Sequence, residues 1–92
     1  MQTDMPLVTI GMPVYNGSAS LESSIESILS QSYQNLEIII SDNNSEDNSV
    51  EICRKYALLD QRITVIQNKK NLGATENSNI LMKAARGKYF ML

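Results

Sequence analysis

The sequence holds 92 residues, 42% hydrophobic and 20% charged, which allows one small globular domain and argues against a two-domain enzyme. Eight Lys and Arg against ten Asp and Glu give a net charge of −2, and without a long basic block this excludes nucleic acid as an expected partner. No stretch reaches the roughly 18 apolar residues of a membrane span, so we expect no direct membrane insertion by this chain.

The first third of the chain predicts a strand followed by a helix. Residues 7–13 form a mostly apolar run that is rich in β-branched side chains and closed by proline, as expected of a strand buried on both faces. Apolar side chains then recur at the i, i+4, i+7 and i+8 positions of a helical stripe, namely Leu21, Ile25, Ile28 and Leu29. Ser20 is the candidate N-cap of this helix.

The middle of the chain repeats this order. Residues 36–40 are a second β-branched run, which a polar segment follows. A second helix is predicted over about residues 48–59, with Ser45 or Asp47 as its cap. Residues 63–66 form the third short β-branched run. The pattern therefore predicts strand, helix and strand in this part of the chain.

The last third predicts another helix and the start of a fourth strand. The helix covers about residues 75–86 and turns four side chains inward, Ile80, Leu81, Ala84 and Ala85. Gly87 stands at the usual left-handed exit position, and residues 88–92 begin the strand. Strands that alternate with helices through short loops predict an α/β fold, a Rossmann-like open parallel sheet with helices on both faces, as a single unit over residues 1–92.

Polar loops follow the predicted strands, and in open α/β sheets ligands bind beyond the carboxyl ends of the strands. Tyr15, after the first strand, can stack on a base. The side-chain oxygens of Asp42 and Asn43, after the second strand, can accept hydrogen bonds from a base edge or a ribose hydroxyl. The alternative is that Asp42, Asn43 and Ser45 form only a polar turn with a helix cap.

Composition excludes several other chemistries. No glycine-rich fingerprint follows the first strand, and no Walker-type Gly-Lys-Ser or Gly-Lys-Thr occurs, which argues against dinucleotide and P-loop sites. Without histidine, the chain cannot form a Ser-His-Asp triad or a His-containing zinc site. Cys53, the only cysteine, lies on the apolar face of a predicted helix and is expected to be buried. A single cysteine fits a reducing compartment, so we predict a cytoplasmic protein whose membrane association would come from other sequence.

Several ordered segments are similar to the N-terminal part of family 2 glycosyltransferases, and the similarity extends over nearly the whole chain. The matching segments are 7–10, 13–16, 27–33, 37–40, 42–47, 71–73 and 85–89. The resemblance implies a GT-A fold in which the fourth strand lies beside the first. It also implies an enzyme that transfers a sugar from a nucleotide diphosphate sugar to an acceptor, with a divalent metal, Mn or Mg, held by an Asp-x-Asp-type motif.

The resemblance places a nucleotide site in this chain. Pro13 and Tyr15 would flank the base, Asp42 and Asn43 would lie against the base edge and ribose, and residues 71–73 would approach the diphosphate. The full set of implied nucleotide-binding residues is Pro13, Tyr15, Asn16, Asp42, Asn43, Asn71 and Gly73. The family often has an Asp pair where this chain has Asp42 and Asn43, which leaves the base open, and an arginine where this chain has Ser78.

The sequence ends before the acidic metal motif, the acceptor site and the catalytic base of the family. We therefore expect a chain truncated after the fourth strand, with no catalytic residue and no metal ligand of its own, which is inactive alone and self-associates through the exposed sheet edge. One alternative is a non-catalytic nucleotide-binding or protein-interaction module of the same fold. Another is a receiver-like or flavodoxin-like domain. The end of the first strand argues against this alternative, because Pro-Val-Tyr-Asn offers neither an acidic pocket nor a phosphate loop.

Overall fold

The structure, a computed structural model, describes residues 5–92 and confirms the predicted order of strands and helices. The bounds of the elements differ from the predicted ones by only a few residues. The elements are β1 (Val8–Val14), α1 (Ser18–Leu29), β2 (Leu36–Asp42), α2 (Ser49–Leu59), β3 (Ile63–Gln67), α3 (Ala74–Ala84) and β4 (Tyr89–Met91). Across residues 5–92, no helix combines the length and apolarity needed to cross a bilayer.

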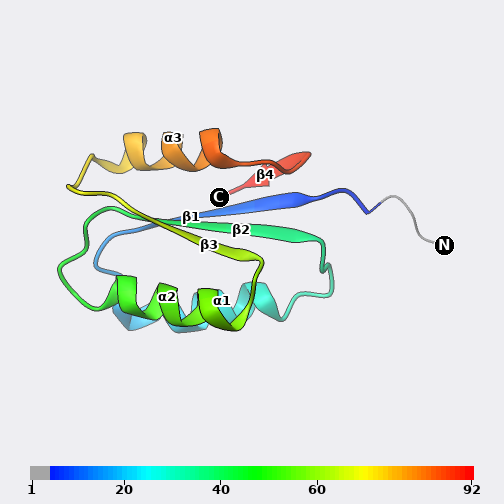
Figure 1. Ribbon diagram of the computed structural model, residues 1–92, viewed down its shortest axis with the longest axis horizontal. Helices are drawn as coiled ribbons and strands as arrows, with labels where there is room; N and C mark the ends of the chain where they lie inside the picture. The colour runs from blue at the N-terminus through cyan, green and yellow to red at the C-terminus, as the bar shows by residue number, and fades with distance from the viewer. Residues whose placement is uncertain (1–4) are drawn as a thin grey trace.

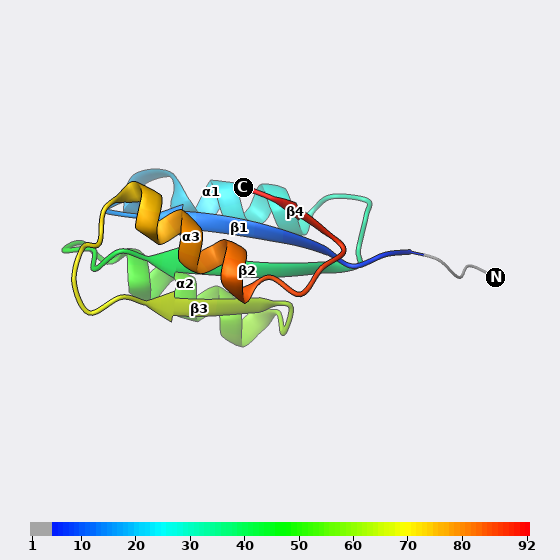
Figure 2. The same cartoon turned by 90° about the horizontal axis from the view of Figure 1, so that it is seen from above.

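Within residues 5–92 the strands form one parallel sheet in the order β3-β2-β1-β4. Val8 of β1 is in register with Leu36 on one side and with Tyr89 on the other, so β4 lies beside β1 as the resemblance implies. Helices α1 and α2 cover one face of the sheet, and α3 covers the other (Figure 1). Seen from above, α3 lies over β1 and β2 (Figure 2). The predicted open parallel sheet with helices on both faces is confirmed.

The two faces of the sheet differ in chemistry because alternate residues of a strand point to opposite sides. Ile38 and Ile40 of β2 are fully buried in the apolar core under α1 and α2, together with Ile25 and Cys53. Of the alternate positions of β2, Ile39 is apolar and buried, whereas Glu37 and Ser41 bond the segment after α3 and α3 itself, as Ser41 does with Asn77. One face is therefore an apolar core, and the other combines buried apolar side chains, such as Ile39 and Leu81, with hydrogen bonds to α3.

Asp47 and Ser49 cap the starts of α1 and α2 together. The Asp47 carboxylate accepts hydrogen bonds from the backbone N–H groups of Ser49 (2.9 Å) and Ser18 (3.2 Å), and the Ser49 hydroxyl accepts one from Gly17 N–H (3.0 Å). The Ser49 hydroxyl also donates to the Asp47 carboxylate at 2.6 Å, and this bond is the main cause that lowers the pKa of Asp47 to about 2, against a smaller opposing effect of burial. Asp47 thus caps as predicted although Asn48 holds the N-cap position.

The predicted N-cap at Ser20 is wrong. Helix α1 begins at Ser18 with Gly17 at its N-cap, which leaves Ser20 inside the helix and exposed to solvent. The prediction failed because the hydroxyl and carboxylate that satisfy the first N–H groups of α1 come from residues about 30 positions further along the chain. Local sequence around a helix start does not contain such a partner.

Gly87 is not the left-handed exit of α3, contrary to the prediction. Helix α3 ends at Ala84, and Ala85 is already extended, whereas the glycine with a positive φ is Gly73 (88°). Gly87 instead allows a close approach, since a Cβ atom there would lie 2.6 Å from the backbone nitrogen of Thr9. The glycine is required because the chain between α3 and β4 passes directly against β1.

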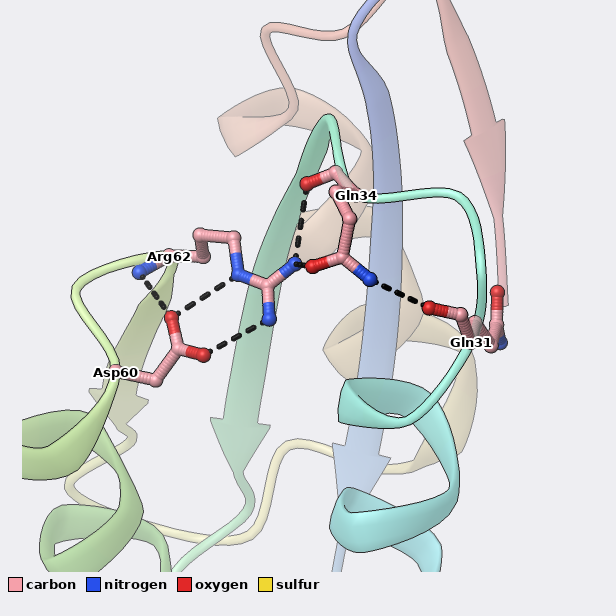
Figure 3. A network of polar contacts seen from close by, with 4 residues as sticks. All are labelled: Gln31, Gln34, Asp60 and Arg62. Carbon is pink, nitrogen blue, oxygen red and sulfur yellow. Dashed lines mark hydrogen bonds and ion pairs between the residues drawn. The ribbon is translucent and has the colours of Figure 1, made fainter.

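A polar network ties the loops at the amino ends of β2 and β3 (Figure 3). The Arg62 guanidinium donates to both carboxylate oxygens of Asp60, at 3.1 and 2.9 Å, and to the backbone oxygen of Gln34 at 3.0 Å. The Gln34 amide then donates to the backbone oxygen of Gln31 at 2.6 Å. These bonds from Arg62 lower the pKa of Asp60. All of these groups have partners within the chain, so we assign the network a structural role at the end of the sheet opposite the candidate site.

Candidate functional site

The loops that follow β1, β2 and β3 converge on a pocket of about 460 Å³ at the carboxyl ends of these strands. Its size lies within the range of small-molecule sites, and its place is the one expected for ligands of open α/β sheets. The lining residues are Pro13, Val14, Tyr15, Asn43, Asn71, Gly73, Ala74 and Asn77. Five of the seven predicted site residues are therefore brought together, whereas Asn16 and Asp42 lie outside the lining.

Tyr15 presents an aromatic ring to the pocket. Tyr15 is 47% exposed, and Pro13, two residues earlier in the chain, is also exposed. Because the ring is not packed into the core, it is free to stack on a planar ligand. Tyr15 therefore lines the pocket as an accessible ring, and its contact with a base stays a prediction.

Asp42 and Asn16 lie beside the pocket and join the two loops. The fully buried Asp42 carboxylate accepts hydrogen bonds from the backbone N–H of Ser45 (2.8 Å) and from its hydroxyl (2.6 Å). Asn16, with a φ of 51°, donates its N–H to the Ser45 hydroxyl and accepts from the N–H of Glu46, both at 2.8 Å. The polar turn that the sequence left open as an alternative is thus present, and a nucleotide contact by Asp42 or Asn16 stays a prediction.

Asn43 is bonded on every side. Its Nδ2 donates to Oδ1 of Asn71 (2.9 Å) and to the backbone oxygen of Gly73 (3.3 Å). Its Oδ1 accepts from the backbone N–H of Leu72 (2.9 Å) and from Nδ2 of Asn68 (3.0 Å). Asn43 therefore ties the end of β2 to the loop between β3 and α3, which forms one wall of the pocket.

Asn77 lines the pocket and Asn68 bonds it from outside the lining, and neither is among the seven residues predicted for the site. Asn77 is 2% exposed, accepts from the Ser41 hydroxyl (2.6 Å) and donates to the Ser41 backbone oxygen (3.0 Å). Asn68 bridges Asn77 and Asn43 through its Nδ2. The sequence signal for Asn77 is its position four residues before Leu81, because this spacing places both side chains on the buried face of α3. We call Ser41, Asn43, Asn68, Asn71 and Asn77 the asparagine frame.

Gly73 sets the start of α3 at the pocket. Its φ of 88° and ψ of 160° lie in a region that essentially only glycine adopts. As the N-cap it has no side chain to cover the first N–H groups of the helix, and the lining includes Ala74, the first residue of α3. The pocket therefore borders a helix N-terminus, whose partial positive charge favours anions.

Cys53 has no place in the site. Burial, and then the negative charge of Asp42, raise the pKa of the Cys53 thiol to about 11, so the thiol stays protonated and inert at neutral pH. This confirms the predicted buried position.

Across residues 5–92, no three Asp, Glu, Cys or His side chains converge as ligands of one metal ion, so these residues by themselves do not fit a metal centre.

Comparison with curated proteins finds glycosyltransferases. The chain is 37% identical to glycosyltransferase GlyG of Streptococcus pneumoniae over 86 residues, which cover 94% of the chain and 29% of GlyG. It is 40% identical to UDP-Glc:alpha-D-GlcNAc-diphosphoundecaprenol beta-1,3-glucosyltransferase WfaP of Escherichia coli over 85 residues, 92% of the chain and 33% of WfaP. The chain thus spans about a third of the length of these relatives.

Solved structures agree with this result. The mannosyltransferase PcManGT from Pyrobaculum calidifontis, in complex with GDP-Man and Mn²⁺, superposes with a TM-score of 0.86 at 25% identity, over 96% of this chain and 27% of that one. Staphylococcus aureus TarS (residues 1–349) has the same fold, with a TM-score of 0.83 at 23% identity over 90% of this chain and 25% of that one. The family model for Glycosyl transferase family 2 matches residues 9–92. The chain therefore belongs to glycosyl transferase family 2, with the GT-A fold, which sets aside the receiver-like and flavodoxin-like alternatives.

Proposed function

We propose that this chain supplies the donor-nucleotide site of an enzyme that transfers a sugar from a nucleotide diphosphate sugar to an acceptor. The observation that carries the proposal is the pocket at the carboxyl ends of β1 and β2, which joins an accessible aromatic ring, Tyr15, to the start of α3. Two similar proteins support it, since WfaP is named for UDP-Glc and PcManGT is in complex with GDP-Man.

The proposed roles follow from position. Tyr15 and Pro13 flank the base at the open side of the pocket. Asn71, Gly73 and the first N–H groups of α3 face the diphosphate, where the helix dipole offsets part of the negative charge that develops on the departing nucleotide. The proposed site also includes Asn16, Asp42 and Asn43 on the side of the base edge and ribose.

Residues 1–92 are proposed as one partial domain of a longer protein. The relatives are about three times as long as this chain. We assign the divalent metal, the acceptor site and the catalytic base to the part of the longer protein that lies outside residues 1–92, so the chain alone is expected to be inactive. We propose a cytoplasmic location for this domain. Sugar transfer by the full-length protein distinguishes this proposal from a non-catalytic nucleotide-binding or protein-interaction module.

Tyr15→Ala is expected to remove at least about a third of the stabilisation that a bound nucleotide gives. A ligand at about 100 times its dissociation constant adds roughly 2.7 kcal/mol to the free energy of unfolding, and loss of base stacking removes about 1–3 kcal/mol of binding free energy. The measurement is a thermal-shift panel with UDP, dTDP, GDP, CDP and ADP, each with and without manganese.

Tyr89→Ala is the matched control for this panel. Tyr89 is also an exposed tyrosine, but it lies in β4, which pairs with the amino-terminal half of β1 and is absent from the pocket lining. We expect its nucleotide-dependent shift to equal that of the unmodified chain. The proposal is wrong if no diphosphate raises the melting temperature, or if both variants respond alike.

The chain is expected to self-associate through β4. This strand has β1 on one side and no strand on the other within residues 5–92, and Tyr89 and Met91 are more than half exposed. An unpaired edge with apolar side chains favours pairing with another copy. Size-exclusion chromatography with light scattering should show a mass that rises with protein concentration toward that of a dimer; a constant monomer mass would contradict the prediction.

A further inference from the structure

The Asn43 amide has no free hydrogen-bonding capacity. A primary amide offers two N–H donors and an oxygen with two lone pairs. Both donors are used, toward Asn71 Oδ1 and the Gly73 backbone oxygen, and both lone pairs are used, by Leu72 N–H and Asn68 Nδ2. A nucleotide atom that bonded this amide would have to displace one of these four partners.

The direction of each bond is fixed by backbone groups that cannot reverse. The Gly73 backbone oxygen only accepts and the Leu72 N–H only donates, so the Asn43 amide can be oriented in one way. Asn71 is fixed likewise, because its Oδ1 accepts from the Gly73 N–H at 2.8 Å as well as from Asn43. Rotating the Asn71 amide by half a turn would place two donors against each other.

We infer that Asn43 is a positioning residue, which holds residues 71–73 in place as the pocket wall and does not bond the nucleotide through its amide. The inference rests on the proposed function for the nature of the ligand. Because it bonds Asn71 and Gly73, Asn43 holds in place both the loop between β3 and α3 and the N-cap of α3. This explains why an amide serves where a carboxylate would not, since a carboxylate has no donor for Asn71 Oδ1 or the Gly73 oxygen.

The remainder of the asparagine frame anchors this loop to the sheet. Asn68 donates to Oδ1 of both Asn43 and Asn77, and Asn77 is bonded twice to Ser41 in the buried face of β2. Within residues 5–92, no buried side-chain nitrogen or oxygen lacks a hydrogen-bond partner. The pocket wall is thus held by hydrogen bonds within the chain, between the asparagine side chains and neighbouring side-chain and backbone groups.

Asn43→Asp tests the inference without nucleotide, by amide hydrogen exchange followed residue by residue with NMR. The substitution keeps the shape and the acceptor but removes both donors, so the Gly73 N–H, bonded to Asn71, should exchange about tenfold faster or more. Exchange at Ile39 in β2 reports opening of the core and serves as the internal reference. Unchanged Gly73 exchange relative to Ile39 would overturn the inference.

Asn44→Asp is the matched control. It adds the same charge one residue further along, at an exposed asparagine with a φ of 66°, a conformation that Asp also tolerates. We expect its effect on Gly73 exchange to be less than about threefold, since no donor of the asparagine frame is removed. An equal effect of both substitutions would attribute the change to charge and overturn the inference.

Two further measurements keep the inference testable if Asn43→Asp does not fold. In the unmodified chain, the Asn43 side-chain N–H signals should be protected from exchange without ligand and stay protected when UDP or GDP saturates the site. Asn71→Ala should raise Gly73 exchange as Asn43→Asp does, and adding Asn43→Asp to it should cause little further change. Unprotected Asn43 signals, or fully additive effects, would contradict the inference. If neither nucleotide binds, the exchange data without ligand still decide the inference, and the proposed function fails separately.

Discussion

Replacing Glu37 by alanine is expected to lower the free energy of unfolding by about 3 kcal/mol, because three hydrogen bonds to a buried carboxylate are lost. Glu37 is 7% exposed and accepts from the Thr9 hydroxyl (2.7 Å), the Arg86 N–H (2.8 Å) and the Arg86 Nε (2.7 Å). The segment between α3 and β4 is attached to the sheet through these bonds. Urea unfolding followed by circular dichroism measures the change.

Glu22→Ala is the control for this substitution. Glu22 pairs with Lys55 at 3.4 Å, but both side chains are more than half exposed, and such pairs contribute about 0–1 kcal/mol. We expect a change within that range for Glu22. A loss for Glu37 no greater than the loss for Glu22 would show that the buried bonds do not stabilise the fold.

The stabilisation by Glu37 is also expected to depend on pH. Burial alone would raise the pKa of Glu37, but the bonds from the Arg86 backbone, Thr9 and the Arg86 guanidinium outweigh it and hold the pKa below its ordinary value of 4.5. The folded state thus binds a proton less readily than the unfolded state, so the contribution is complete above the ordinary pKa and is lost as pH falls through the folded one. The stability difference between the unmodified chain and Glu37→Ala should therefore shrink below about pH 4.5.

The elements of the fold could be predicted because each leaves a periodic pattern in its own segment. The stripe that begins at Leu21 packs against the core, with Leu21 and Ile25 buried and Ile28 and Leu29 partly buried, and the β-branched run at residues 36–40 is buried. The burial of Glu37 within that run could not be foreseen, since its partner Arg86 lies 49 positions away. Local pattern gives the element, whereas the pairing of polar groups depends on tertiary structure.

The candidate site shows the same division. Tyr15 and Gly73 follow the predicted strands and line the pocket, because topology brings the carboxyl ends of parallel strands to one edge. The bonding of Asn43 within the asparagine frame could not be deduced, because an asparagine after a strand is equally suited to a turn, a cap or a ligand contact. Asn77 was missed because a single polar residue in a helix does not reveal which side chain it bonds.

Gly87→Ala is expected to destabilise the chain by about 3 kcal/mol or more by forcing β4 away from β1. The added Cβ would lie 2.6 Å from both the backbone nitrogen and the hydroxyl oxygen of Thr9, and 2.9 Å from the backbone oxygen of Leu7. Backbone atoms cannot move aside as a flexible side chain does. The bonds from Gly87 N–H to the Thr9 hydroxyl and from Lys88 N–H to the Leu7 oxygen, both 2.8 Å, would then break.

The pattern of damage distinguishes this mechanism from a general loss of glycine flexibility. Gly17→Ala adds the same methyl group at a φ of −104°, where the nearest atom, on Val14, is 3.9 Å away, so it should cost at most about 1 kcal/mol. In Gly87→Ala, exchange of the Lys88 N–H should rise far more than exchange in β2, since β4 detaches before the core opens. Equal stability losses at Gly17 and Gly87, or a Lys88 N–H that stays protected, would show that β4 does not depend on this close approach.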